Sequence, residues 1–292
     1  MRIAVTGTTG QVVSAILAAA PSDVEIIALG RPDIDLADPD SLRQPIVAVR
    51  PDVIVSAAAY TAVDKAESEP ELAQAVNGVA PGVLAAIASD LGVPVIHLST
   101  DYVFDGSKPG PYVEDDVTGP LGVYGATKLA GEIAVRAATD DHVILRTAWV
   151  YSQFGGNFVK TMLRLAQSRD EVSVVADQRG CPTCAVDIAC AVIAIARQLK
   201  DNESSALRGT FHLSAPDEAS WADFATAIFA GLAARGGKTV GVNSIATRDY
   251  PTPARRPANS RLNGDRLAAA YGIRLPSWRQ SLDGTLDILL SE

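Results

Sequence analysis

The sequence contains little of what usually builds a metal or redox centre, with three cysteines and three histidines in 292 residues. Cys181 and Cys184 are separated by two residues, a spacing that occurs in zinc and redox sites. No second cysteine pair and no nearby histidine completes a zinc site, and Cys190 stands apart. We therefore expect buried or loop thiols here and no metal centre.

An excess of positive charge is also absent. The formal net charge is −9, which argues against a general nucleic-acid or anionic-membrane surface but not against a small anion held by a few local arginines. No positively charged leader precedes the first apolar run, and charged residues interrupt the long Ala/Val/Ile segments before they reach membrane length. The composition predicts a soluble, cytoplasmic globular protein with neither nucleic acid nor membrane as partner.

Short apolar runs alternate with helical segments through the first half of the chain. This alternation predicts an α/β fold with a doubly wound, parallel, Rossmann-like sheet, whose ligands gather at the carboxyl ends of the strands. Asp38 and Pro39 fit the N-cap and first residue of one helix. The expected strands are 2–6, 24–29, 53–56 and 93–98, and the expected helices are 12–20, 39–50, 69–77 and 81–91.

The strict alternation loosens after Tyr151. We therefore predict a mainly Rossmann-like domain over 1–150 and a smaller substrate-binding α/β part over 151–292, and leave open whether segments of the second part return to the first. Ser220 is expected to cap a helix. The elements expected here are strands 172–175 and 209–213 and helices 158–168, 186–199, 222–234 and 278–290.

A glycine turn, Gly7-Thr8-Thr9-Gly10-Gln11, joins the first strand to the first helix. Such a turn places a helix N-terminus and free backbone N–H groups against a pyrophosphate. The spacing is G-x-x-G and not the usual G-x-G-x-x-G, and Val13 stands where a third glycine is expected. By itself the turn therefore fits an ordinary strand–helix connection equally well.

Arg31 and Asp35 follow the second strand. At this place an acidic residue commonly binds the ribose of NADH, whereas an arginine suits the 2′-phosphate of NADPH. Because Arg31 is nearer to the strand end, the sequence leans towards NADPH, and an exposed loop arginine is the alternative.

Tyr124 and Lys128 are spaced to share one helical face, and Thr100 follows the fourth strand. A phenol has a pKa of about 10, and a cation about 4 Å away contributes about 4 kcal/mol at an effective dielectric constant of about 20. Lys128 could thus lower the pKa of Tyr124, which would protonate a carbonyl that Thr100 orients. An ordinary amphipathic pair is the alternative. His97, a lone histidine within a strand, is interpreted as a packed core residue.

Several longer motifs resemble the extended short-chain dehydrogenase/reductase superfamily and, within it, the dTDP-4-dehydrorhamnose reductase family. The resemblance covers nearly the whole chain. Its motifs are Gly7-x-x-Gly10, Ala58-Ala59-Tyr60-Thr61-Ala62-Val63-Asp64-Lys65-Ala66-Glu67, Thr100-Asp101-Tyr102-Val103-Phe104-Asp105-Gly106, Tyr124-Gly125-Ala126-Thr127-Lys128, Arg146-Thr147-Ala148-Trp149-Val150-Tyr151, Asp177-Gln178-Arg179-Gly180-Cys181-Pro182-Thr183 and Arg256-Pro257-Ala258-Asn259-Ser260-Arg261-Leu262.

The resemblance implies reduction, by NADPH or NADH, of the C4 keto group of a dTDP-linked sugar during polysaccharide biosynthesis. The implied catalytic residues are Thr100, Tyr124 and Lys128. Together with the glycine turn and the small residues after the third strand, it assigns the cofactor to Gly7, Thr9, Gly10, Gln11, Val12, Arg31, Asp35, Leu36, Ala57, Ala58, Ala59, Tyr124 and Lys128. The implied substrate-binding residues are Thr100, Asp101, Tyr124, Trp149, Arg256 and Asn259.

The chain departs from the family pattern at the positions that bind a metal in some members. Those members dimerise through a magnesium ion held by glutamates, and Ala15 and Val186 occupy the matching positions here. We therefore predict no metal ligands, and a monomer or a homodimer without a magnesium link.

Two other functions remain open from the sequence. One is a sugar epimerase or dehydratase on the same fold, although dehydratases of the superfamily usually carry Thr-Asp-Glu where this chain has Tyr102 as the third residue. The other is a non-catalytic regulatory subunit that resembles the β subunit of methionine adenosyltransferase, against which the intact Tyr124, Lys128 and Thr100 argue.

Overall fold

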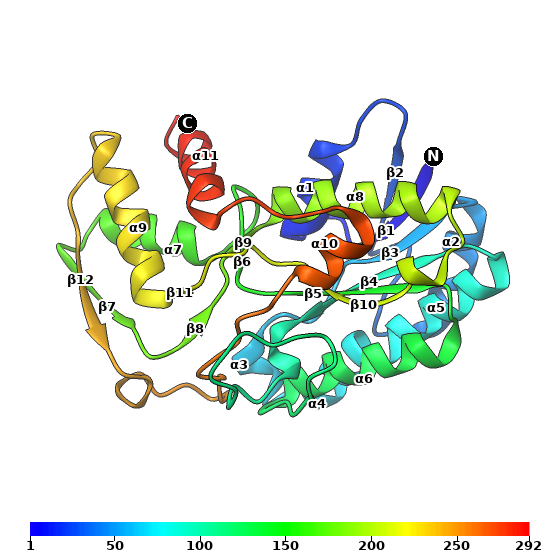
Figure 1. Cartoon of the computed structure of the whole chain (residues 1–292), viewed down its shortest axis with the longest axis horizontal. Helices are drawn as coiled ribbons and strands as arrows, with labels where there is room; N and C mark the ends of the chain where they lie inside the picture. The colour runs from blue at the N-terminus through cyan, green and yellow to red at the C-terminus, as the bar shows by residue number, and fades with distance from the viewer. Residues whose placement is uncertain (292) are drawn as a thin grey trace.

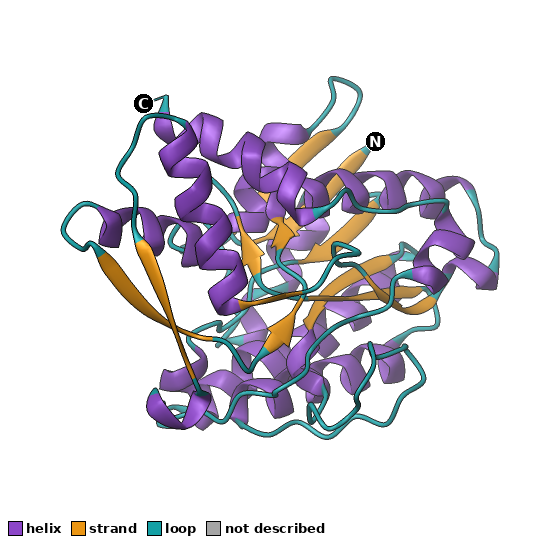
Figure 2. Ribbon diagram, turned by 60° about the vertical axis from the view of Figure 1, so that its left-hand side comes forward, coloured by secondary structure: helices purple, strands orange, loops and turns teal. Residues whose placement is uncertain are grey.

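Six parallel strands form the central sheet of the computed structural model, which describes residues 1–291 (Figures 1 and 2). Their order is β10-β5-β4-β3-β1-β2. Strands β3, β4 and β5 are buried along their whole length because helices cover both faces, which explains their continuous apolar runs. The strands are β1 (Arg2–Thr6), β2 (Glu25–Leu29), β3 (Val53–Ser56), β4 (Val95–Thr100), β5 (His142–Thr147) and β10 (Gly209–His212).

The helices flank this sheet and build a second lobe beside it (Figure 1). The α-helices are α1 (Gln11–Ala19), α2 (Arg43–Ala48), α3 (Val63–Ala66), α4 (Pro70–Gln74), α5 (Ala80–Leu91), α6 (Val123–Ala138), α7 (Phe158–Ala166), α8 (Ala185–Asp201), α9 (Trp221–Ala234), α10 (Asp265–Tyr271) and α11 (Trp278–Leu290). Short 3₁₀ helices occur at Pro39–Ser41, Asp101–Val103, Ser205–Leu207 and Thr247–Asp249.

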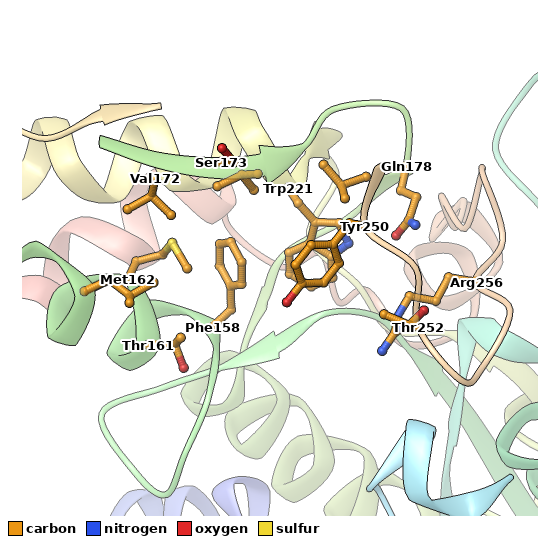
Figure 3. Close-up of a pocket in the computed structure, with 13 residues that line it drawn as sticks. Phe158, Thr161, Met162, Val172, Ser173, Gln178, Trp221, Tyr250, Thr252 and Arg256 are labelled. Atoms are coloured by element: carbon orange, nitrogen blue, oxygen red, sulfur yellow. The ribbon is translucent and has the colours of Figure 1, made fainter. Parts of the chain in front are cut away.

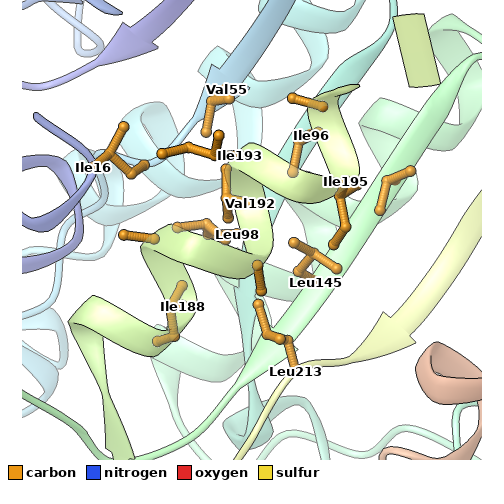
Figure 4. Packing of buried hydrophobic residues seen from close by; sticks show 14 of the residues in the cluster. Ile16, Val55, Ile96, Leu98, Leu145, Ile188, Val192, Ile193, Ile195 and Leu213 are labelled. Atoms are coloured by element: carbon orange, nitrogen blue, oxygen red, sulfur yellow. The ribbon is translucent and has the colours of Figure 1, made fainter. Parts of the chain in front are cut away.

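Two cores enclose the central sheet, and the pleat of β1 contributes to both. Ile3 and Val5 pack on the side of α1 and α8, whereas Ala4 between them packs on the side of α2 and α5. Figure 4 shows Ile188 and Val192 of α8 close to the strand side chains. The predicted fold class, a doubly wound parallel sheet with helices on both faces, is confirmed. Because β1 lies between β2 and β3, the winding reverses there and opens a crevice at the strands' carboxyl ends.

The second lobe gathers α7, α9 and α11 around a separate core beside the parallel pair β7 (Glu171–Val175) and β12 (Gly241–Ile245). Two shorter pairs join it to the sheet lobe: β6 (Val150–Tyr151) with β9 (Thr183–Cys184), and β8 (Arg179–Gly180) with β11 (Ala219–Ser220). Ser220 caps α9 in a capping box with Asp223, as the sequence predicts. Helix α8 and strand β10 return to the central sheet, so the chain crosses between the lobes more than once.

The predicted helix over 39–50 is wrong in its details. The chain forms a 3₁₀ turn at Pro39–Ser41 and then α2, and the Asp38 side chain makes no capping hydrogen bond. Pro45 has no backbone N–H to donate to the carbonyl four residues earlier, so a regular α-helix cannot run through this point from Pro39.

The two helices expected at 69–77 and 81–91 are instead one continuous helix, Pro70–Leu91, with a π-helical turn at Ala75–Val79. Pro81 cannot donate a hydrogen bond to the carbonyl of Asn77, and the wider turn accommodates it. By length and composition this helix could cross a membrane, yet half of its apolar window is buried within the fold. Burial of this kind is typical of a core helix.

Replacing Gly131 by alanine is expected to destabilise the protein. A Cβ at Gly131 would lie 2.1 Å from the Asn77 carbonyl oxygen, so the two helices would have to separate. Thermal unfolding should show a loss of about 1–3 kcal/mol, the usual cost of overpacking. The matched control is Gly284→Ala on the exposed face of α11, where a Cβ meets nothing within 4 Å and alanine should stabilise by up to about 1 kcal/mol. Equal melting temperatures for the two variants would contradict the predicted contact.

Candidate active site

A cleft of about 520 Å³ lies at the carboxyl ends of the central strands. It brings together most of the residues that the sequence assigns to a dinucleotide, and it also contains Tyr124 and Lys128. Asp35 and Leu36 line an adjoining hollow of about 250 Å³, which shares Gly7, Thr9 and Arg31 with the cleft. The cleft is lined by Gly7, Thr8, Thr9, Gly10, Gln11, Val12, Val13, Arg31, Ala57, Ala58, Ala59, Thr61, Leu98, Ser99, Tyr124, Lys128, Thr147, Val150, Gly155 and Gly156.

The glycine turn has the geometry of an anion site at a helix N-terminus. Gly7 adopts φ +96°, where a side chain would be strained, and a Cβ there would lie 3.1 Å from the Ala58 Cβ. Gly10 is the N-cap of α1, makes no side-chain cap and has open space beside it. The first N–H groups of α1 are therefore available for a phosphate, and the residues present fit a dinucleotide.

Thr6 and Gln11 hold this turn in place. Thr6 Oγ1 accepts hydrogen bonds from the backbone N–H groups of Ala57 and Ala58, at 3.0 and 3.1 Å, which ties the end of β1 to the end of β3. Gln11 Oε1 accepts from Ser152 Oγ at 2.9 Å. Thr6 was not predicted to have this role, because the sequence shows only a hydroxyl residue at the end of a strand.

Arg31 and Asp35 lie as the sequence leads one to expect, at the end of the cleft next to β2. The Arg31 side chain is 81% exposed and its nearest carboxylate oxygen, on Asp35, is 3.9 Å away. Its guanidinium group is therefore accessible to a phosphate from solvent.

Thr100 and Asp101 connect β4 to a 3₁₀ turn. Thr100 Oγ1 donates to Asp101 Oδ1 at 2.9 Å and accepts from the N–H of Tyr102. Asp101 is 3% exposed, and its Oδ2 has no hydrogen-bond partner among residues 1–291. Burial raises the pKa of Asp101 to about 6, although Ser260 and Thr100 oppose the shift. A buried carboxylate with a free oxygen is suited to receive a donor from a ligand.

Tyr124 begins α6, one turn before Lys128, so both side chains face the same cleft. Burial raises the pKa of Tyr124 to about 12, while Thr100 lowers it and the charge of Asp101 raises it. The prediction that Lys128 lowers the pKa of Tyr124 is therefore wrong. The phenol stays protonated at neutral pH.

Lys128 points its ammonium group towards β4, which explains why it does not lower the Tyr124 pKa. Its Nζ donates to the Leu98 carbonyl oxygen at 2.6 Å, and the residue is 2% exposed. Burial lowers the pKa of Lys128 to about 8, and the charge of Glu132 partly offsets this. The ammonium group is thus fixed at the cleft wall, and its neutral form predominates above pH 8.

Trp149 stands at the junction of the two lobes in a strained backbone conformation, with φ +48°. Its ring stacks on that of Trp221, with centroids 3.6 Å apart and an angle of 5° between the planes. Gly180 permits this placement because a Cβ there would lie 2.3 Å from the Trp149 ring.

A second hollow, of about 320 Å³, lies in the second lobe next to this tryptophan pair (Figure 3). Arg256 reaches it, and Arg256 Nη2 is held 2.7 Å from Asp64 Oδ2. Its aromatic wall is formed by Phe158, Trp221 and Tyr250, none of which was predicted to bind a ligand. The only signal for the first two is an aromatic residue directly after a helix N-cap, Asn157 or Ser220.

Asn259, predicted to contact substrate, lines neither hollow. Its Nδ2 donates to the carbonyl oxygens of Lys108 and Gly110, at 2.6 and 2.8 Å, and its Oδ1 accepts from Arg261 Nε at 2.8 Å. Both the nitrogen and the oxygen of its side-chain amide are engaged, so in this structure Asn259 holds the loop that contains Lys108 and Gly110.

The positions considered for magnesium are apolar. Ala15 is fully buried on α1 and Val186 is partly buried beside it on α8, so neither supplies a ligand. Within residues 1–291 no group of three or more His, Cys, Asp or Glu side chains could hold a metal ion. Cys181 and Cys184 are buried free thiols, and burial raises the pKa of Cys181 to about 11.

Comparisons with known proteins show the family to which the chain belongs. The sequence model of the RmlD substrate binding domain matches residues 1–291. A dTDP-4-dehydrorhamnose reductase of Sinorhizobium fredii is 56% identical over 292 residues, which span 100% of this chain and 99% of the relative. The crystal structure of such a reductase from Clostridium acetobutylicum has a TM-score of 0.91 and 37% identity, covering 99% of this chain and 100% of that chain.

A third comparison concerns the cofactor. The crystal structure of dTDP-4-dehydrorhamnose reductase from Bacillus anthracis in complex with NADP has a TM-score of 0.91 and 33% identity, covering 98% of this chain and 99% of that one. Likeness at this level extends over nearly the whole length of the chains compared. The chain therefore belongs to the dTDP-4-dehydrorhamnose reductase family of NAD(P)H-dependent oxidoreductases.

Proposed function

We propose that the protein reduces the C4 keto group of dTDP-4-dehydro-L-rhamnose to the hydroxyl of dTDP-L-rhamnose, with Tyr124 as proton donor. The observation that carries the proposal is that Tyr124 and Lys128 line the same cleft as the glycine turn, beside the strand end that bears Thr100. NADPH or NADH, held by the turn, Arg31 and Ala57–Ala59, supplies the hydride for the carbonyl carbon when bound.

The protein's own residues complete the reduction by handling the oxygen. With substrate bound, Thr100 donates its hydroxyl hydrogen to the carbonyl oxygen in place of Asp101 Oδ1 and orients that oxygen towards the Tyr124 hydroxyl. As negative charge develops on that oxygen, Tyr124 transfers its proton, because a phenol, even with a pKa of about 12, is a stronger acid than the sugar hydroxyl that forms. The Lys128 ammonium group lines the same cleft, where it would donate a hydrogen bond to the nicotinamide ribose of the bound cofactor.

The nucleotide part of the substrate is assigned to the second hollow. Arg256 offers a planar fork of donors that suits a diphosphate, and it lies beside Tyr102, whose ring packs edge-on against Tyr124 with centroids 5.7 Å apart. The Trp149–Trp221 stack offers a flat apolar surface at the second hollow, which Trp221 lines.

The test is an assay of the purified protein with dTDP-4-dehydro-L-rhamnose and each reduced cofactor. One NADPH or NADH should be oxidised for each dTDP-L-rhamnose formed. A dehydratase or an epimerase recycles its cofactor and would consume none. Absence of reduction, with a synthetase co-purifying, would instead indicate a regulatory subunit and overturn the proposal.

The rate of reduction is expected to fall above pH 8. Lys128 has an ordinary pKa of 10.5 that burial lowers to about 8, so its cation is present below pH 8 and is lost as the pH rises through that value. A plot of log kcat against pH should turn downward near pH 8 and approach a slope of −1. A plateau that extends to pH 10 would show that Lys128 is not needed as a cation.

A further inference from the structure

His97 is a core histidine that does not itself line the cleft but contacts Lys128, which does. It lies in β4, is 0% exposed, and contacts a polar group at each end of its ring. Nδ1 is 3.0 Å from Ser56 Oγ of β3, and Nε2 is 3.4 Å from Lys128 Nζ of α6. One of these two partners, Lys128, lines the cleft.

The protonation of this ring follows from its surroundings. Burial, together with the charges of Lys128 and Arg136, lowers the pKa of His97 well below its ordinary value of 6.5, so the ring is neutral. A neutral ring has one N–H and one acceptor nitrogen. Because the ammonium group of Lys128 can only donate, Nε2 is the acceptor and the proton is on Nδ1, facing the Ser56 hydroxyl.

We infer that His97 is a positioning residue for Lys128. An ammonium group has three donors. The Leu98 carbonyl oxygen takes one, the His97 Nε2 takes a second, and the third is left for the cleft that Lys128 lines. The Ser56 hydroxyl, which can accept as well as donate, takes the Nδ1 proton of this tautomer. Since His97 is fully enclosed, it offers no path for a proton to solvent, and its effect is to orient the ammonium group and stabilise its charge.

Another charged group near this pair also acts on the pKa of Lys128. Glu132 on α6 raises the pKa of Lys128 and is itself paired with Arg146 of β5 and Arg136 of α6. Because His97 is neutral, its removal takes away a hydrogen-bond acceptor and not a charge. The inference rests on the role proposed above for Lys128, so its test needs a measurement that does not depend on the sugar.

The test compares His97→Asn with His97→Gln. The asparagine amide reaches the position of Nδ1 and can contact Ser56 but not Lys128, whereas the glutamine amide reaches the position of Nε2 and can accept from Lys128. Binding of NADPH, followed by its fluorescence from pH 6 to 10, and kcat over the same range are the two measurements. The matched control is His142→Gln. His142 is a buried histidine at the start of β5, the end of the strand away from the cleft.

His97→Asn should shift the alkaline fall of both profiles to lower pH by about one unit, because the charged form of Lys128 loses an acceptor. His97→Gln and His142→Gln should keep the wild-type profiles. Equal shifts in His97→Asn and His97→Gln, or none in His97→Asn, would overturn the inference. If His97→Asn does not fold, Ser56→Ala should give a smaller shift in the same direction, and no shift would overturn it. If the wild-type protein binds NADPH with this pH profile but does not reduce the sugar, the proposed function is wrong while the inference about His97 still stands.

Discussion

Tyr124→Phe is expected to lower kcat by about 10³-fold while NADPH still binds. The substitution keeps the ring and its edge-on contact with Tyr102 but removes the hydroxyl that gives its proton to the substrate oxygen. Because the phenol is neutral over the working pH range, no charge is lost from the cleft, and the cofactor affinity should change by less than about threefold. Stopped-flow turnover with the keto sugar and fluorescence titration with NADPH measure the two quantities.

The control for the loss of a buried hydroxyl is Tyr271→Phe in α10. That tyrosine donates to the carbonyl oxygen of Leu207 on the far side of the sheet lobe, so the variant loses stability but not turnover. Near-normal turnover by Tyr124→Phe would show that another group provides the proton. A parallel loss in Tyr271→Phe would point instead to a general effect on folding.

Glu132→Gln should produce the largest loss of stability, about 3–5 kcal/mol in the free energy of unfolding. Glu132 is fully buried on α6 and pairs with Arg146, which is 3% exposed, through Nε–Oε1 and Nη2–Oε2 contacts of 2.9 and 2.8 Å. Burial alone would raise the pKa of Glu132, but the bonds to Arg146 more than offset it, so the pKa is lowered. Glutamine has nearly the same shape but leaves the guanidinium group as an uncompensated buried charge.

Urea denaturation and thermal melting at pH 7 measure this loss, which corresponds to a fall in Tm of about 6–15 °C. The matched control is Asp90→Asn, which breaks the exposed pair with Arg43 at 2.6 Å and should cost less than about 1 kcal/mol. The depressed pKa of Glu132 means that its stabilising effect is present at neutral pH and is lost as the pH falls through that pKa. If Glu132→Gln loses no more stability than Asp90→Asn, the buried Glu132–Arg146 pair does not stabilise the protein.

Local patterns were sufficient to predict most of the fold. The strands β1 and β3 and helix α11 begin and end where their apolar patterns do, because hydrophobic periodicity and capping depend on neighbouring residues. The two errors in helix continuity arise at prolines, whereas β12 and α10 were not predicted at all. Pro45 divides a predicted helix, whereas Pro81 lies within a continuous one, because packing against α6 stabilises a π turn that local propensity does not favour.

Spacing along one element was enough to predict the glycine turn, the Tyr124–Lys128 face and the strand end at Thr100. It could not predict where the Lys128 ammonium group points, that Trp149 stacks on Trp221, or that Asn259 holds a loop. These features depend on burial and on hydrogen-bond partners that come from residues distant in sequence. Burial is what raises the Tyr124 pKa and lowers that of Lys128, and no spacing rule contains it.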